Sequence, residues 1–131
     1  MPIRVLLVDD DPLVRAGLRF LLESADDLTV VGECGDGDEV VAAVRVSSPD
    51  VVLMDLRMER VSGIEATARV RALADPPHVI ALTTWDVDDA VIRTLDAGAS
   101  GFLLKTAAPM EIVGAVRAVV QGDAVLSPRS T

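Results

Sequence analysis

Short apolar runs recur along the chain, and polar residues follow them. Runs of this length without alternation are typical of strands that are buried on both faces of a parallel sheet. The predicted strands are Ile3–Val8, Leu28–Glu33, Val51–Met54, His78–Leu82 and Gly101–Leu104. Asp55 closes the run VVLMD, and its carboxylate would be costly to bury among apolar neighbours. We therefore expect Asp55 at the point where its strand ends.

Segments with helical spacing of apolar residues separate these strands. Asp11 followed by Pro12 is typical of a helix start, because aspartate caps the first turn and proline suits its first position. The predicted helices are Pro12–Glu23, a short helix around Val40–Val44, Ile64–Ala74, Asp86–Ala97 and a last helix from Pro109 to about Gly122. The side chains of the last helix that are expected to face the core are Ile112, Val113, Val116 and Val120. Alternating strands and helices predict an α/β fold with a parallel sheet and right-handed crossovers.

Composition narrows the class of protein. The chain has 131 residues, half of them apolar and a quarter charged, which predicts one globular domain over residues 1–122. No apolar run approaches the roughly 20 residues of a membrane span, and no leader pattern is present, so we expect a cytoplasmic protein. Cys34 is the single cysteine and is expected in the core. The net charge of −9 argues against direct binding to nucleic acid.

The tail, residues 123–131 (DAVLSPRST), lacks the helical pattern. It is predicted to be the start of a linker, and we expect further protein to follow it.

Chemistry-bearing residues gather where the predicted strands end. Asp9 and Asp10 follow the first strand, Asp55 the third, Thr83 the fourth, and Lys105, the one lysine of the chain, the fifth. In a doubly wound sheet the ligand site lies beyond these carboxyl ends. Each residue alone is more typical of a turn, a strand end or a surface charge, but the set together predicts a site.

The predicted cluster suits a magnesium ion and a phosphoryl group. Adjacent carboxylates repel one another unless a cation joins them, and Mg²⁺ prefers oxygen ligands. A lysine and a hydroxyl suit phosphoryl oxygens, whose transfer depends on positioning and charge neutralisation. Asp55 is the natural nucleophile, since an aspartate can form an acyl phosphate.

Four stretches make the chain resemble a response-regulator receiver domain of two-component signalling, in particular receivers that precede a LuxR/NarL-type helix-turn-helix domain. They are VLLVDDDPLVRAGL (Val5–Leu18), VVLMDLRM (Val51–Met58), ALTTWD (Ala81–Asp86) and AGASGFLLK (Ala97–Lys105). The resemblance implies a flavodoxin-like sheet in the order 2-1-3-4-5. It also implies a phosphoprotein that acts in transcription regulation and binds DNA only through an output domain outside this chain.

The resemblance assigns a role to each site residue. A sensor histidine kinase would transfer a phosphoryl group to Asp55, and the implied Mg²⁺ ligands are Asp10, Asp55, the backbone carbonyl of Arg57 and, through water, Asp9. Lys105 would pair with phosphoryl oxygens and Thr83 would donate its hydroxyl. Phe102 would be the aromatic switch, although an aromatic on a core strand is ordinarily core packing. The face of helix 4, strand 5 and helix 5 would carry the output, often as a homodimer.

Two residues depart from the family pattern. Glu59 follows Met58 where proline is usual, so the loop Leu56–Gly63 is expected to be more mobile and more acidic. Asp11 stands where histidine is frequent and is expected to cap the first helix. Trp85 is expected at the rim of the site.

Two other functions remain open on the sequence. A phosphatase of the haloacid dehalogenase type would use Asp9 and Asp11 as its D-x-D pair, but it needs further acidic ligands after the lysine. A degenerate receiver would act as an interaction module without phosphorylation, and Glu59 is the feature that favours it.

Overall fold

Five parallel strands form the centre of the molecule, a computed structural model that describes residues 2–84 and 89–123. The strands are β1 (Ile3–Val8), β2 (Leu28–Cys34), β3 (Val51–Asp55), β4 (His78–Thr83) and β5 (Gly101–Leu104). Their order in the sheet is β2-β1-β3-β4-β5, which confirms the predicted fold class. Strand order therefore reverses between β1 and β3, the place where doubly wound sheets bind ligands.

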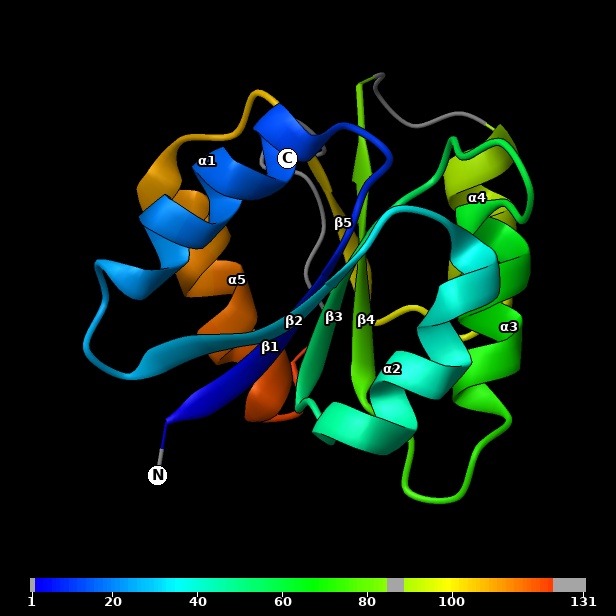
Figure 1. The fold of residues 1–131 in the computed structure, drawn as a ribbon, viewed down its shortest axis with the longest axis horizontal. Coiled ribbons are helices and arrows are strands. Elements are labelled where there is room, and N and C mark those ends of the chain that lie inside the picture. The colour runs from blue at the N-terminus through cyan, green and yellow to red at the C-terminus, as the bar shows by residue number, and fades with distance from the viewer. Residues whose placement is uncertain (1, 85–88, 124–131) are drawn as a thin grey trace.

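Helices cover both faces of the sheet (Figure 1). One face carries α1 (Pro12–Glu23) and α5 (Pro109–Val120), and the other carries α2 (Val40–Ser47), α3 (Gly63–Arg71) and α4 (Asp89–Asp96). A 3₁₀ turn, η1 (Gly37–Glu39), leads into α2. Among the described residues, no helix has both the length and the apolar character that crossing a bilayer requires.

Each face has its own apolar core. Leu53 and Leu82 of the sheet belong to the cluster beneath α1 and α5, while Val52 and Met54 belong to the cluster beneath α2 and α3. Successive residues of β3 point to opposite faces, so an uninterrupted apolar strand supplies both cores. Cys34 is buried in the second cluster, as predicted, and burial raises the pKa of its thiol to about 11.

The strand register brings the predicted site residues to one edge. Val8 pairs with Met54, so Asp9 and Asp10 leave β1 beside Asp55 at the end of β3. Asp55 pairs with Leu82 and Thr83 with Leu104, so Thr83 and Lys105 follow on the next two strands.

Several predicted boundaries differ from the observed ones. The second strand extends to Cys34, and β3 and β4 include Asp55 and Thr83. The third helix ends at Arg71 rather than Ala74, because Leu73 N–H bonds the Val70 carbonyl in a tighter turn before the Pro76–Pro77 pair, which disfavours helix in the residue preceding it.

The two last helices also differ in part. In α5, Val119 is buried and Val120 is 39% exposed, so the prediction of an inward Val120 was wrong. The predicted start of the fourth helix at Asp86 and the position of Trp85 lie outside the described residues. So does the predicted linker beyond Asp123.

Candidate functional site

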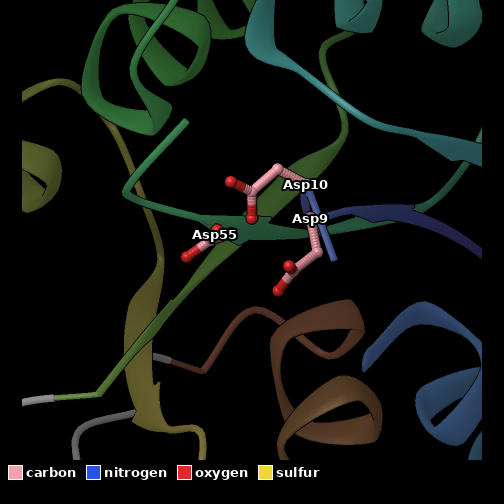
Figure 2. Close-up of side chains that lie close together, drawn as sticks. All are labelled: Asp9, Asp10 and Asp55. Atoms are coloured by element: carbon pink, nitrogen blue, oxygen red, sulfur yellow. The ribbon is translucent and has the colours of Figure 1, made fainter. Parts of the chain in front are cut away.

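Three aspartates converge at the end of β1 and β3. One carboxylate oxygen from each of Asp9, Asp10 and Asp55 lies within 4.8 Å of the other two. Figure 2 shows that Asp9 and Asp10 leave the end of β1 on different sides, next to Asp55 on β3. Asp9 and Asp55 are only 1% and 3% exposed, whereas Asp10 is exposed. The site therefore combines two buried carboxylates with one that faces solvent.

Lys105 joins the two buried carboxylates. Its ammonium nitrogen lies 2.9 Å from Oδ2 of Asp9 and 3.1 Å from Oδ1 of Asp55. The Lys105 N–H donates to the Thr83 carbonyl at 2.7 Å, which fixes the lysine backbone to the end of β4. Burial lowers the pKa of the Lys105 ammonium, but its contacts with Asp9 and Asp55 outweigh burial and the net pKa is raised. Lys105 is therefore held in its charged form between two anions.

The two oxygens of Asp55 have different surroundings. Oδ1 contacts Lys105 and accepts the N–H of Arg57 at 3.4 Å, whereas Oδ2 is buried and accepts no hydrogen bond from the described residues. Burial first, and then the charge of Asp9, raise the pKa of the Asp55 carboxyl despite the opposing effect of Lys105. We expected Asp55 to emerge where its strand ends; it does end β3, but it stays buried there at this electrostatic cost.

Neighbouring backbone groups fix Asp9. The Asp11 N–H donates to Oδ1 of Asp9 at 2.9 Å, and the Arg15 guanidinium donates to the Asp9 carbonyl at 2.5 Å. The Asp11 side chain in turn accepts the N–H of Leu13 at 2.9 Å, which confirms its prediction as the cap of α1. Arg15 was not among the predicted site residues, because its contact with Asp9 is to a backbone carbonyl, which no residue pattern reveals.

A cavity of about 190 Å³ opens beside Asp55. Its lining includes the predicted site residues Asp10, Arg57, Thr83 and Lys105, together with Leu56, Leu82 and Thr84. The cavity is therefore bordered by the carboxylate residues Asp10 and Asp55, by two threonines and by a lysine. The role of the Arg57 backbone carbonyl as a metal ligand stays a prediction.

Phe102 lies apart from this cavity. It is 2% exposed and packs in a small cluster with Leu56, Ala81 and Val91, beneath α4. Leu56 also lines the cavity, so one apolar side chain contacts both places. This packing does not test the switch role of Phe102, which stays a prediction.

The donor set fits a magnesium ion. Three carboxylates meet at one point, and a buried oxygen of Asp55 has no hydrogen-bond partner among the described residues. An unpaired buried carboxylate oxygen is costly, and a hard cation with oxygen preference satisfies it. Asp9, Asp10 and Asp55 are thus the residues that can hold the ion.

Comparison with known proteins identifies the family. The model of the response regulator receiver domain matches residues 5–117, so the chain belongs to this family. The crystal structure of a LuxR-family two-component response regulator from Aurantimonas superposes with a TM-score of 0.92 and 35% identity, covering 98% of this chain and 92% of that one.

Two curated relatives come from Bacillus subtilis. The transcriptional regulatory protein LiaR is 47% identical over 97% of this chain and 60% of its own length. The uncharacterised transcriptional regulatory protein YxjL is 43% identical over 94% of this chain and 56% of its own length. The chain thus spans little more than half of these relatives. The family assignment favours the receiver interpretation over the haloacid dehalogenase alternative.

Proposed function

We propose that this receiver domain accepts a phosphoryl group on Asp55 from a phosphohistidine of a sensor histidine kinase. The observation that carries the proposal is the buried Asp55 carboxylate, one oxygen of which has no hydrogen bond from the described residues, next to a charged lysine and the acidic pair Asp9 and Asp10. An Asp55 oxygen forms a bond to phosphorus while the phosphorus–nitrogen bond to the histidine breaks. The domain is a phosphoacceptor rather than an enzyme with turnover.

Asp10, Asp55 and the backbone carbonyl of Arg57 would hold Mg²⁺, and Asp9 would act through water. Bound there, the ion would neutralise negative charge on the phosphoryl oxygens as they approach the acidic site. The convergence of the three carboxylates supports this assignment.

Lys105 and Thr83 would bind the phosphoryl oxygens. Lys105 already lies 3.1 Å from Asp55, so its ammonium needs little movement to reach a group attached to that carboxylate. Thr83 lines the same cavity, and its hydroxyl can donate to an oxygen there. These contacts would exist only in the phosphorylated state and would favour a second conformation.

Phe102 would report that change to the surface. The Phe102 side chain packs in one cluster with Val91 of α4, and Phe102 lies opposite Ala81 of β4 in the strand register. Movement of the Thr83 segment would therefore alter the surroundings of Phe102. The face of α4, β5 and α5 would then change its affinity for a second copy or for an output domain.

The whole protein would regulate transcription in the cytoplasm. The relatives LiaR and YxjL are named transcriptional regulatory proteins and extend well beyond the matched region. DNA would be bound by a helix-turn-helix domain that follows the linker starting near residue 123. The strongly acidic composition of this chain supports the assignment of DNA binding to a separate domain.

Intact-protein mass tests the proposal. The protein is incubated with acetyl phosphate and Mg²⁺, in parallel with the variants Asp55→Asn and Asp50→Asn. Asp50 serves as the control because it directly precedes β3, at the amino end of the strand that Asp55 ends. We expect the mass of one phosphoryl group on wild type and Asp50→Asn, none on Asp55→Asn, and none in any sample with a chelator.

The contrary result favours the degenerate interaction module. That reading predicts no added mass under conditions in which a control receiver is labelled, and no binding of beryllofluoride.

A further inference from the structure

A buried carboxylate outside the site anchors the loop that follows Asp55. Asp36 is 2% exposed and lies between β2 and η1. Its Oδ1 accepts the N–H of Gly37 and of Val61, each at 2.8 Å, and its Oδ2 accepts the N–H of Arg60 at 3.0 Å. Two of these donors belong to the loop 56–62, more than twenty residues away along the chain. The carboxylate therefore joins the end of β2 to the loop between β3 and α3.

Close packing supports the same junction. A Cβ on Gly37 would overlap the Val61 backbone carbonyl, so the loop approaches η1 as closely as a glycine permits. At the other end of the loop, the Gly63 N–H donates to the Leu56 carbonyl at 3.2 Å, and a Cβ on Gly63 would lie 2.8 Å from the Leu56 Cα. The loop is thus held at Arg60–Val61 and closed at Leu56–Gly63.

The loop 56–62 contributes Leu56 and Arg57 to the lining of the cavity beside Asp55. Arg57 follows Asp55 by two residues, donates its N–H to Oδ1 of Asp55 and lines the cavity. Between Arg57 and the anchored Arg60 stand only Met58 and Glu59. A shift of the anchor is therefore transmitted over two residues to the backbone of Arg57.

We propose that Asp36 is a positioning residue for the Mg²⁺ site, because its hydrogen bonds to Arg60 and Val61 hold the loop that presents the backbone of Arg57 beside Asp55. This inference rests on the proposed function.

The Arg60 side chain is a separate contact. Its guanidinium pairs with Asp38 at 2.8 Å and with Glu39 at 3.0 Å, but these groups are exposed. Exposed ion pairs contribute little, so the backbone N–H of Arg60 rather than its guanidinium is assigned the positioning role.

The test is Mg²⁺ affinity, measured by titration calorimetry on the unphosphorylated protein. Asp36→Asn keeps the size of the side chain but turns an amide toward at least one N–H donor. We expect Mg²⁺ binding about tenfold weaker, in line with other residues that orient metal ligands indirectly. Phosphorylation at saturating Mg²⁺ should return close to the wild-type rate, and hydrogen exchange at the Arg60 and Val61 amides should quicken.

Three further variants make the test specific. Gly37→Ala displaces the loop while retaining the carboxylate, and should weaken Mg²⁺ binding even if Asp36→Asn does not fold. Arg60→Ala removes the exposed ion pairs and should leave affinity unchanged. Asp50→Asn alters a carboxylate that accepts the Arg4 N–H at 2.9 Å on the opposite edge, and should affect stability alone.

The outcomes separate the two proposals. If wild type takes up a phosphoryl group but folded Asp36→Asn and Gly37→Ala bind Mg²⁺ as tightly as wild type, Asp36 has no positioning role and the proposed function stands. If Arg60→Ala weakens binding as much as Asp36→Asn, the guanidinium holds the loop and the inference is wrong. Failure of wild type to be phosphorylated rejects the proposed function instead.

Discussion

Asp36 and Asp55 are both buried aspartates at the same edge of the sheet, yet their surroundings are opposite. Asp36 accepts three backbone N–H groups, whereas one oxygen of Asp55 has no hydrogen bond from the described residues. Burial raises the pKa of Asp36, but the three donors and the nearby Arg60 outweigh it and lower the net pKa. Burial and Asp9 raise the pKa of Asp55.

The difference separates a structural carboxylate from a reactive one. A carboxylate whose oxygens are satisfied by the backbone stabilises its charged form and holds two loops together. A carboxylate that keeps one oxygen without a hydrogen bond, beside another anion, is a place where a cation or a phosphoryl group can bind. Burial alone does not distinguish the two cases; the hydrogen-bond partners do.

Apart from loss of the acceptor itself, the largest effect is expected at Lys105, whose ammonium contacts Asp55. Lys105→Met should slow phosphoryl incorporation by about 100-fold, as removal of a group that stabilises developing charge does elsewhere. Lys105→Arg keeps the charge with a different shape and should fall between wild type and Lys105→Met. Initial rates from quenched samples, read as intact mass, decide this; a wild-type rate for Lys105→Met would remove the lysine from the mechanism.

Stability should change in opposite directions at the two aspartates. In Mg²⁺-free buffer at pH 7, Asp36→Asn should lower the melting temperature, because it removes a satisfied charge. Asp55→Asn should raise it, because it removes a charge that burial and Asp9 oppose. Thermal unfolding followed by circular dichroism measures both, and a shift in the same direction for both variants would contradict the comparison.

The pH dependence of these stability differences follows from the pKa directions. The stabilisation from Asp36 is present above its unfolded pKa of about 3.9 and is lost as the pH falls through its lower folded pKa. The advantage of Asp55→Asn over wild type should instead shrink as the pH falls from 7 through the raised pKa of Asp55. Urea unfolding at a series of pH values provides the free energies; parallel pH curves for the two variants would refute the assignment.

The smallest effect is expected at Glu59, which is exposed. Glu59→Pro should change Mg²⁺ affinity by less than about twofold, as surface substitutions do, since Asp36 already holds the loop. In the Glu59→Pro background, however, the loss caused by Asp36→Asn should become smaller, because proline restricts the same loop. A double-mutant cycle with calorimetry measures this coupling. Additive effects on Mg²⁺ affinity would show that the hydrogen bonds of Asp36 and the proline at position 59 act independently on the loop.

Much of the fold, and the residues at the carboxyl ends of the strands, could be predicted because both depend on the local pattern of apolar and polar residues. The apolar run before Asp55 required a strand buried on two faces, and a parallel sheet then placed Asp9 and Lys105 on the same edge. What the strand pattern could not reveal was that Asp55 would stay buried at 3% exposure, since burial depends on tertiary packing around the strand end.

Hydrogen bonds between residues far apart in the sequence could not be predicted. Asp36 stands between two glycines, a pattern that by itself is typical of a turn. Its partners at Arg60 and Val61 are backbone N–H groups, which carry no residue signature. The inward Val120 failed for a different reason: the turn from Val116 allowed either Val119 or Val120 to face the core, and packing against the sheet selected Val119.

The central claim is that Asp55, and not another buried or clustered aspartate, receives the phosphoryl group. The direct measurement is peptide mapping after reaction with acetyl phosphate and Mg²⁺, with hydroxylamine converting the acyl phosphate to a stable hydroxamate. We predict the modification on Asp55 alone, with the peptides that carry Asp9, Asp10 and Asp36 unmodified. Modification at any of those three residues, with Asp55 unmodified, would contradict the account.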